Sequence, residues 1–435
     1  MKMNRSFKIF DLGDDNFDAI LALRRAHQHF RETCLLNSNG YRHDRYGTYD
    51  QLLALGAAQT TNTNSADAFS ALKEMADQTN DWLFGYFSYD LKNQLENLQS
   101  NRHDGLQFPL VHFYRPVAVV IVDGNRLNIG CLPGFGDASS PDWVFEQLTA
   151  GPEPAPLPSQ PVKPLARVSR ERYLKQVSAI QNHIRIGDIY EINYCVEFFD
   201  EAAQIDPYRT YANLNQLSPT PFSAFYRTSD HYLICVSPER FIKKQGEQLI
   251  SQPIKGTRRR GQSSEEDSRL RHELYHDPKE RSENVMIVDL VRNDLSHVAA
   301  PNSVKVTELF GIYSFSTVHQ MISTVTARLR PDRHFTDALR HAFPMGSMTG
   351  APKVRAMQLI EQYEDTRRGL FSGAVGYITP TGDFDFNVVI RSILYNAQNK
   401  YLCFLAGSAI TAAAIPEKEY DECLLKARTM LKALE

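Results

Sequence analysis

Six prolines between residues 151 and 164 constrain the folding of this chain more than any other feature. They occupy positions 152, 154, 156, 158, 161 and 164, and each proline lacks an amide N–H and fixes its own φ angle. Such a density excludes a helix and favours an extended, polyproline-like chain. We therefore expect residues 151–166 to form an exposed connector between an N-terminal region, residues 1–150, and a larger region, residues 167–435.

The composition indicates a large globular protein. The chain has 435 residues, 42% of them hydrophobic, and a formal net charge of −3, so no overall electrostatic field attracts nucleic acid or anionic lipid. Its six cysteines are scattered without a Cys-x-x-Cys pair, which is typical of buried thiols in a reducing compartment. With no apolar run of the ~20 residues that span a bilayer and no signal peptide, we expect a cytoplasmic protein.

A helix and a strand are predicted directly after the connector. Ser169 is a plausible N-cap, apolar residues follow it at helical spacing, and Gly187 ends the pattern. Residues 189–199 then alternate as a strand, which places Glu191 and Asn193 on one face and Ile192 on the other.

Two segments carry paired carboxylates. Asp277-Pro278 is a good helix start, after which Glu280 and Glu283 project from one face because they are three residues apart. Pro416 opens a second helix, on which three charged residues recur on a single face: Glu419, Glu422 and Lys426. Paired carboxylates suit a hard cation such as Mg²⁺. The alternative interpretation is that both faces are simply solvated.

Lys255 precedes a Gly256-Thr257 turn and the arginines at positions 258–260. Neighbouring cations push the pKa of an ammonium down, whereas a nearby carboxylate such as Glu239 pushes it up, and the sequence does not decide which effect prevails. A lowered pKa would leave Lys255 partly neutral and nucleophilic. The alternative is a solvated basic loop.

Two further features indicate an anionic ligand. Residues 343–353 form a glycine-rich loop that enters a helix at Pro352, where free amides attract anions, although no Walker motif is present. Arg391 lies on an apolar strand and needs a carboxylate partner. That partner is either a ligand or Asp385 of the same chain.

Several motifs resemble, in order and spacing, the chorismate-utilising enzymes, the family of anthranilate, aminodeoxychorismate, isochorismate and salicylate synthases. The resemblance covers nearly the whole chain and is firm from about Val168 onward. It rests on the following segments: Ser237-Pro238-Glu239-Arg240, Pro253-Ile254-Lys255-Gly256-Thr257, residues 277–295, residues 343–353, residues 372–377, residues 389–392 and Glu419-Tyr420-Asp421-Glu422.

The resemblance implies an α+β fold in which antiparallel sheets form a sandwich-like core with helices outside. It also implies that Lys255 adds to C2 of chorismate while Glu239 protonates the departing C4 hydroxyl. Mg²⁺ is implied on Glu283 and Glu422, with Glu280 and Glu419 acting largely through water. Arg391 is implied to bind the enolpyruvyl carboxylate, and Lys426 is implied to bind another carboxylate. Both belong to the substrate-binding residues that the resemblance implies: Gly256, Thr257, Ser347, Thr349, Gly350, Tyr377, Arg391, Gly407 and Lys426.

Lys255 also selects a branch of the family, because anthranilate synthases usually carry alanine there. The resemblance therefore implies amination of chorismate at C4, which feeds p-aminobenzoate and folate synthesis. No cysteine sits in a nucleophile-elbow context, so we expect ammonia from a separate glutamine amidotransferase subunit. The alternatives are an anthranilate synthase and a non-catalytic chorismate-binding paralogue.

Three positions are open or depart from the family. Ser38 matches a serine of the tryptophan pocket in some members, and the alternative is a buried strand end. Glu191 stands where the family usually carries glutamine, or lysine in isochorismate and salicylate synthases, so we do not expect hydroxide delivery to C2 as the main activity. Ala409 replaces a usual glycine and puts a backbone contact to the ring carboxylate in doubt.

Overall fold

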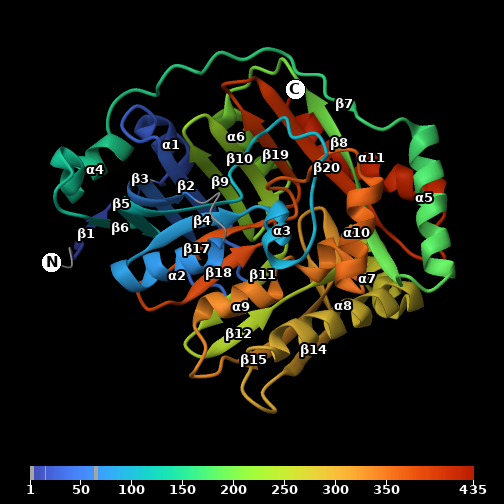
Figure 1. Cartoon of the computed structure of the whole chain (residues 1–435). Helices are drawn as coiled ribbons and strands as arrows, with labels where there is room; N and C mark the ends of the chain where they lie inside the picture. Colours follow the sequence, from blue (N-terminus) through green and yellow to red (C-terminus); the bar gives the residue numbers. More distant parts are fainter. Residues whose placement is uncertain (1–3, 15, 63–66) are drawn as a thin grey trace.

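Strands dominate the computed structural model, which describes residues 4–14, 16–62 and 67–435. Before the connector the elements are β1 (Ser6–Asp11), α1 (Ala19–Ala26), β2 (Glu32–Asn37), β3 (Gln51–Asn62), α2 (Ala68–Thr79), β4 (Leu83–Phe87), η1 (Tyr89–Leu91), α3 (Lys92–Leu95), β5 (Val111–Asp123), β6 (Arg126–Cys131), η2 (Gly136–Ser139) and α4 (Pro141–Thr149) (Figure 1).

The part after the connector carries the remaining elements. They begin with β7 (Leu165–Ala166), α5 (Arg170–Arg185), β8 (Glu191–Asp200), α6 (Pro207–Leu217), β9 (Phe222–Thr228), β10 (His231–Ser237), β11 (Arg240–Gln245), β12 (Gln248–Ser251), β13 (Ile254–Arg259), α7 (Ser264–His276) and α8 (Pro278–Ser296). They end with β14 (Lys305–Ser314), β15 (Val318–Arg328), α9 (Phe335–Ala342), η3 (Gly346–Met348), β16 (Gly350–Ala351), α10 (Lys353–Tyr363), β17 (Ala374–Ile378), β18 (Phe384–Asn387), β19 (Ser392–Asn396), β20 (Tyr401–Ile410) and α11 (Pro416–Ala433).

The strands form two antiparallel runs that share the long strand β5. One run follows the order β1, β6, β5, β3, β2, β9, β10, β19, β20 and β8. The other leaves β5 through β4, β17, β18, β11, β12 and β15, and β13 and β14 also pair with β15. Strands from before and after the connector therefore pair directly, as β2 does with β9.

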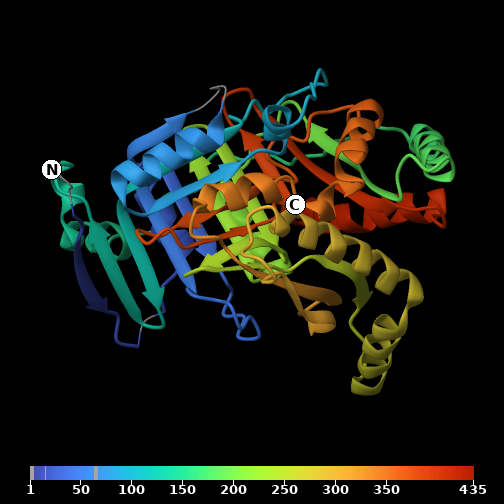
Figure 2. The same cartoon turned by 60° about the horizontal axis from the view of Figure 1, so that its bottom comes forward.

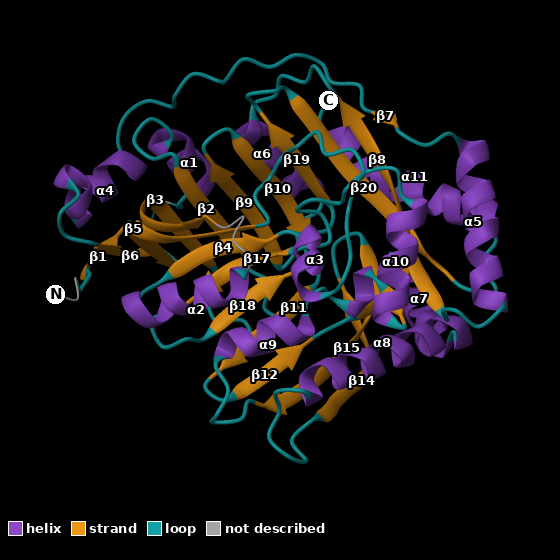
Figure 3. Cartoon of the chain, in the orientation of Figure 1, coloured by secondary structure: helices purple, strands orange, loops and turns teal. Residues whose placement is uncertain are grey.

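Two large apolar clusters explain why the runs stack and where the helices lie. One cluster joins Leu52 of the first run to Phe84 and Phe386 of the second, so it fills the space between them. The other includes Leu23 of α1 and Tyr173 of α5 and covers the outer face of the first run. Figure 3 shows helices around the strands, and Figure 2 shows α7 and α8, in gold, at their edge. The expectation of an α+β fold with a sandwich-like core and outer helices is confirmed.

The connector contains no helix or strand from residue 152 to 164, and most of its residues are exposed, as its prolines predict. In Figure 1 it runs over the top of the molecule from α4 to β7. The division of the chain into regions 1–150, 151–166 and 167–435 stays a prediction.

Local sequence rules hold in the elements that follow the connector. The Ser169 hydroxyl caps α5 by accepting a hydrogen bond from the Arg172 amide at 3.3 Å. In β8, Ile192 packs among the residues under the helices, whereas Glu191 lies on the opposite face of the strand.

All six cysteines are buried and free. Within the described residues, no helix combines the length and apolarity that crossing a membrane requires.

Candidate active site

A buried ion pair between Lys255 and Glu191 lies at the centre of the site. Lys255 is the second residue of β13 and Glu191 is the first residue of β8. The Lys255 ammonium donates a hydrogen bond to Oε1 of Glu191, and the two residues are 9% and 0% exposed. The other carboxylate oxygen of Glu191, Oε2, is buried and has no hydrogen-bond partner among the described residues. Strand β8 therefore supplies a carboxylate with a spare acceptor.

Carboxylates control the protonation of Lys255. Burial lowers its pKa, but attraction and hydrogen bonding to Glu191, together with attraction to Glu283 and Glu239, outweigh burial and raise the pKa above its usual value. Lys255 is therefore an ammonium in the protein without ligand.

The carboxylates, and not the arginines that follow Lys255 in sequence, decide the direction of its pKa shift. Arg258 donates to Asp277 at 2.5 Å, Arg259 pairs with Glu266, and Arg260 pairs with Asp267 at 2.8 Å. Each arginine is thus neutralised by an acid of α7 or at the start of α8. The pKa of Lys255 instead follows the carboxylates that surround its own side chain.

Glu239 has the protonation expected of an acid catalyst. It lies just after β10 and is 4% exposed. Burial raises its pKa to about 7, although Ser347, the Ile254 backbone and Lys255 act in the opposite direction. A large fraction of Glu239 is therefore protonated at neutral pH and can donate a proton.

The four glutamates from the two predicted faces differ in burial. Glu283 on α8 and Glu419 on α11 are buried, whereas Glu422 is exposed and lies 2.8 Å from Lys426. Burial raises the pKa of Glu283 to about 7 and also raises those of Glu280 and Glu419. Oε1 of Glu283 is buried without a hydrogen-bond partner among the described residues.

Lys279 places a cation among these carboxylates. Burial lowers its pKa, but Glu283, Glu419, Glu280 and Glu422 together outweigh burial and raise it. Its ammonium lies 3.7 Å from Oε1 of Glu283. The sequence interpretation missed this role, although Lys279 and Glu283 have the i,i+4 spacing of a helical ion pair.

The carboxylates fit a hard cation in donor type. In the described ranges, no three histidine, cysteine, aspartate or glutamate side chains stand ready to hold a metal ion. The unpartnered oxygen of Glu283 nevertheless suits an oxygen-seeking cation such as Mg²⁺. The Lys279 side chain beside Glu283 is half exposed.

The glycine-rich loop borders Glu191. In it, β16 pairs with the start of β8, and Gly350 has a φ of +148°. A Cβ at Gly350 would lie 2.2 Å from the Glu191 carbonyl oxygen, so this close approach requires glycine. Ser347 lines one cavity with Glu239, and Thr349 is fully buried beside them.

Two residues that the sequence interpretation did not assign to the site hold this loop on β8. The Asn193 side chain donates to the Ser347 carbonyl at 2.5 Å. Arg368 donates to the Met348 carbonyl at 2.7 Å and to the Asn193 carbonyl at 2.9 Å. Only long-range contacts reveal these roles.

Lys255 and Gly256 form an irregularity in β13, between Ile254 and Thr257, which both pair with β15. Gly256 has a φ of +98°, and a Cβ there would lie 3.2 Å from Oε2 of Glu280. This glycine therefore lets the Lys255 strand approach the carboxylates of α8.

Arg391 is a cation without a carboxylate partner in the part of the chain that the structure describes. It lies just before β19 with a left-handed φ of +48°, and burial is the only influence that lowers its pKa. Among the described residues, no carboxylate pairs with it. The alternative partner, Asp385, instead accepts from Arg240 at 2.9 Å and lies 3.4 Å from Lys243, so the internal pair of Arg391 with Asp385 is wrong. Arg391 can therefore receive an external carboxylate.

The remaining predicted residues lie on β20, α11 and β17. Lys426 donates to the Gly407 carbonyl at 2.8 Å, and Ala409 lies opposite Asn193 in the regular ladder between β20 and β8. Tyr377 packs against the rings of Tyr49 and Trp82 and shares a cavity with Ser38. That cavity differs from the one that Glu239 lines. The structure thus places Tyr377 with Ser38.

Comparison with known proteins gives consistent matches. A family model described as chorismate binding enzyme matches residues 31–432. Aminodeoxychorismate synthase component 1 of Bacillus subtilis is 34% identical over 362 residues, 81% of this chain and 76% of the relative. Anthranilate synthase component 1 of Thermus thermophilus is 35% identical over 359 residues, with the same two coverages of 81% and 76%.

Solved structures share the fold. The isochorismate synthase MenF of Escherichia coli superposes with a TM-score of 0.79 at 15% identity and covers 100% of this chain and 96% of its own. Anthranilate synthase component I of Streptococcus pneumoniae has a TM-score of 0.74 at 25% identity and covers 98% of this chain and 92% of its own.

Proposed function

Because the chain belongs to the family of chorismate binding enzymes, we propose that it is an aminodeoxychorismate synthase component 1. It replaces the C4 hydroxyl of chorismate by an amino group from ammonia, for p-aminobenzoate and folate synthesis. The observation that carries the proposal is the buried Lys255 ammonium beside Glu191 and Glu239. Relatives named aminodeoxychorismate synthase component 1 from several bacteria support it.

Lys255 acts as the nucleophile and Glu239 as the acid. Nζ of Lys255 adds to C2 of chorismate, the ring double bond shifts, and the C4 hydroxyl leaves as water with a proton from Glu239. Ammonia then adds to C4 and expels Lys255 from C2. Splitting one displacement into two is the advantage of covalent catalysis, and the pKa of about 7 for Glu239 suits its role as acid.

Two cations, Arg391 and Lys426, are available to bind carboxylates of the substrate. Arg391 has no protein carboxylate among the described residues to compete for it, and Lys426 is exposed beside Glu422. A guanidinium holds a carboxylate by two parallel hydrogen bonds, which also fixes its orientation. Arg391 therefore binds the enolpyruvyl carboxylate in this proposal.

Glu283 and Glu422 would hold Mg²⁺ directly, with Glu280 and Glu419 acting largely through water. When bound, Mg²⁺ offsets the charge of the ring carboxylate and positions it. The buried unpartnered oxygen of Glu283 supports this placement. Replacement of Glu283 by alanine should reduce turnover about a thousandfold and abolish Mg²⁺ binding in calorimetry, while circular dichroism stays unchanged. Full turnover after exhaustive chelation would contradict the metal requirement.

Ammonia should come from a partner subunit. The relatives' designation as component 1 implies a second component, and we propose that it is a glutamine amidotransferase. The pure chain should therefore use ammonium but not glutamine. Glutamine-driven product from the pure chain alone would contradict this assignment.

Product identification tests the proposed function against its nearest alternative. Chorismate, Mg²⁺ and ammonium are incubated with the pure chain, and the products are separated by chromatography. We expect 4-amino-4-deoxychorismate, and Lys255→Ala serves as the matched control. Anthranilate as the main product would instead assign the chain to the anthranilate synthases, which match at similar identity.

A further inference from the structure

We infer that Glu191 is the proton acceptor that converts the Lys255 ammonium into the attacking amine. The inference rests on the proposed function and adds a catalytic group to it. Its basis is geometric: Oε1 of Glu191 accepts a hydrogen bond from Nζ of Lys255, and the carboxylate is fully buried. Among the described residues, Glu191 is the one group that accepts a hydrogen bond from this ammonium.

A buried pair of this kind can lose its charges without exchanging a proton with solvent. Moving one proton from Nζ to Oε1 converts two buried ions into a neutral amine and a neutral acid, and low polarity favours the neutral pair. Glu191 has a second oxygen, Oε2, that is buried without a partner among the described residues. The carboxyl group thus has room to hold the proton while the nitrogen lone pair turns to the substrate.

The protons balance over the cycle. Glu191 takes a proton from Nζ, the N–C2 bond forms, and the C4–O bond breaks as Glu239 supplies the proton that makes water. Ammonia then forms the C4–N bond, the C2–N bond breaks, and Lys255 leaves as a neutral amine. Glu191 returns its proton to Lys255, and the new C4 ammonium reprotonates Glu239. The net change is chorismate plus ammonia to aminated product plus water.

Three further acids interact with the pair of Lys255 and Glu191 and must be considered in any test with pH. Glu283 approaches from α8, Glu239 from the loop after β10 and Glu422 from α11. Lys255 is among the influences on Glu239, so a ratio of variant to wild-type rates at each pH cancels the ionisation of ammonium only. The labelling measurement below reports the protonation of Lys255 separately.

The deciding variant is Glu191→Gln, which keeps the shape but cannot accept a proton. In the wild-type protein the proton stays within the pair, whereas in the variant Lys255 must release it to solvent. At saturating Mg²⁺, the variant-to-wild-type ratio of kcat/KM should rise about tenfold per pH unit between about pH 6 and pH 8. A ratio that stays constant over this range would overturn the inference.

Two further variants separate this role from a structural one. Glu191→Asp retains a carboxylate and should lower the rate while keeping the ratio flat with pH. Glu361→Gln makes the same amide replacement in another buried lysine–glutamate pair, with Lys92, and should also give a flat ratio. A sloping ratio for either variant would contradict a specific role for Glu191.

A labelling measurement keeps the inference separate from the proposed function. Acetic anhydride reacts with neutral amines, and peptide mass spectrometry reports acetylation of Lys255 at each pH. In Glu191→Gln, half-maximal labelling should move to lower pH, because burial is then less opposed by negative charge. An unmoved labelling curve would overturn the inference. If the wild-type protein makes no aminated product but the curve moves, the proposed function fails and the proton-sharing pair stands.

Discussion

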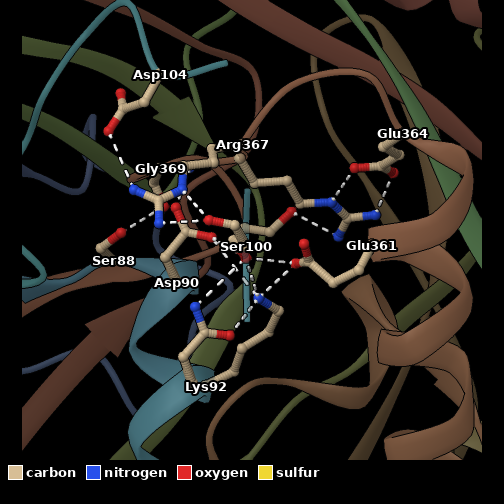
Figure 4. Close-up of polar contacts among 12 residues, drawn as sticks. Ser88, Asp90, Lys92, Ser100, Asp104, Glu361, Glu364, Arg367 and Gly369 are labelled. Atoms are coloured by element: carbon tan, nitrogen blue, oxygen red, sulfur yellow. Dashed lines mark hydrogen bonds and ion pairs between the residues drawn. The ribbon is translucent and has the colours of Figure 1, made fainter. Parts of the chain in front are cut away.

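Lys255 and Lys92 are both buried lysines, but their surroundings differ in one respect. Lys92 on α3 is 0% exposed and lies 3.0 Å from Ser100 Oγ, 3.1 Å from Asn93 Oδ1 and 2.6 Å from Glu361 Oε1. Figure 4 shows its side chain pointing toward Asp90, Ser100 and Glu361. Three N–H donors thus have three acceptors, and one of these, Glu361, comes from a distant part of the chain.

The Lys255 environment is incomplete by comparison. Among the described residues only Glu191 accepts a hydrogen bond from it, and Oε2 of Glu191 and Oε1 of Glu283 are buried without partners. An unsatisfied buried polar atom costs free energy, and a ligand that pairs with it would remove that cost. A buried lysine whose donors all have acceptors thus stabilises the fold, whereas the unpartnered oxygens around Lys255 mark the proposed reaction site.

Replacement of Lys255 by alanine should have the largest effect on turnover. We expect the rate with ammonium to fall about ten-thousandfold, because the nucleophile is lost, while chorismate affinity stays within about tenfold, roughly 1.4 kcal/mol. Intact-protein mass spectrometry of the wild type during turnover should show an adduct that maps to residues 253–258. A Lys255→Ala variant that aminates chorismate at the wild-type rate would remove the nucleophile from the mechanism.

Replacement of Lys92 by methionine should reduce stability and leave turnover nearly unchanged. It leaves Asp90 and Glu361 without their buried cation, so the free energy of unfolding should fall by roughly 3–5 kcal/mol. The folded fraction should keep its turnover within about threefold, since the cluster touches no proposed substrate contact. Urea unfolding and a steady-state assay measure the two quantities.

Lys8→Met is the control for this comparison, because Lys8 is half exposed and pairs with Asp142 at the surface. It should change the free energy of unfolding by less than about 1 kcal/mol. Equal losses for Lys92→Met and Lys8→Met would show that the satisfied cluster contributes nothing special to stability.

The sequence predicts the parts of this site that local chemistry decides. The N-cap of α5 and the alternation of β8 follow from neighbouring residues, and both are observed. The motifs also identify Lys255 and Glu239 as candidates, and the structure places both in buried surroundings that shift their pKa values. In these cases the signal lies within a few residues of the group concerned.

Contacts between distant segments could not be predicted in this way. Glu191 and Lys255 are 64 residues apart and come from strands that do not pair with each other, so no spacing rule joins them. The arginines after Lys255 are adjacent in sequence, yet their side chains turn to α7 and α8. Tyr377 matched a motif, but the course of β17 places it with Ser38. Adjacency in sequence does not decide the pKa of Lys255, because the fold determines which side chains meet.

The raised pKa of Glu239 gives a smaller effect on stability. The unfolded chain releases this proton near its usual pKa of 4.5, whereas the folded protein holds it until about pH 7. The contribution of Glu239 to the free energy of unfolding therefore falls as pH rises through this window, by an amount on the order of 3 kcal/mol. Glu239→Gln should remove that decline, which urea unfolding at pH 5 and pH 8 measures. A variant that keeps the wild-type pH dependence would show that Glu239 titrates normally.

The smallest effect is expected for Arg259→Gln. Arg259 is adjacent to the reactive strand residues in sequence, but its side chain is 60% exposed and pairs with Glu266. Solvent and salt screen such a charge from a buried ammonium. The pH of half-maximal acetylation of Lys255 should therefore move by less than about 0.3 units in this variant, against a clear shift in Glu191→Gln. A shift of similar size in both variants would mean that the pKa of Lys255 depends on the charge of the arginines adjacent in sequence as much as on the buried Glu191 carboxylate.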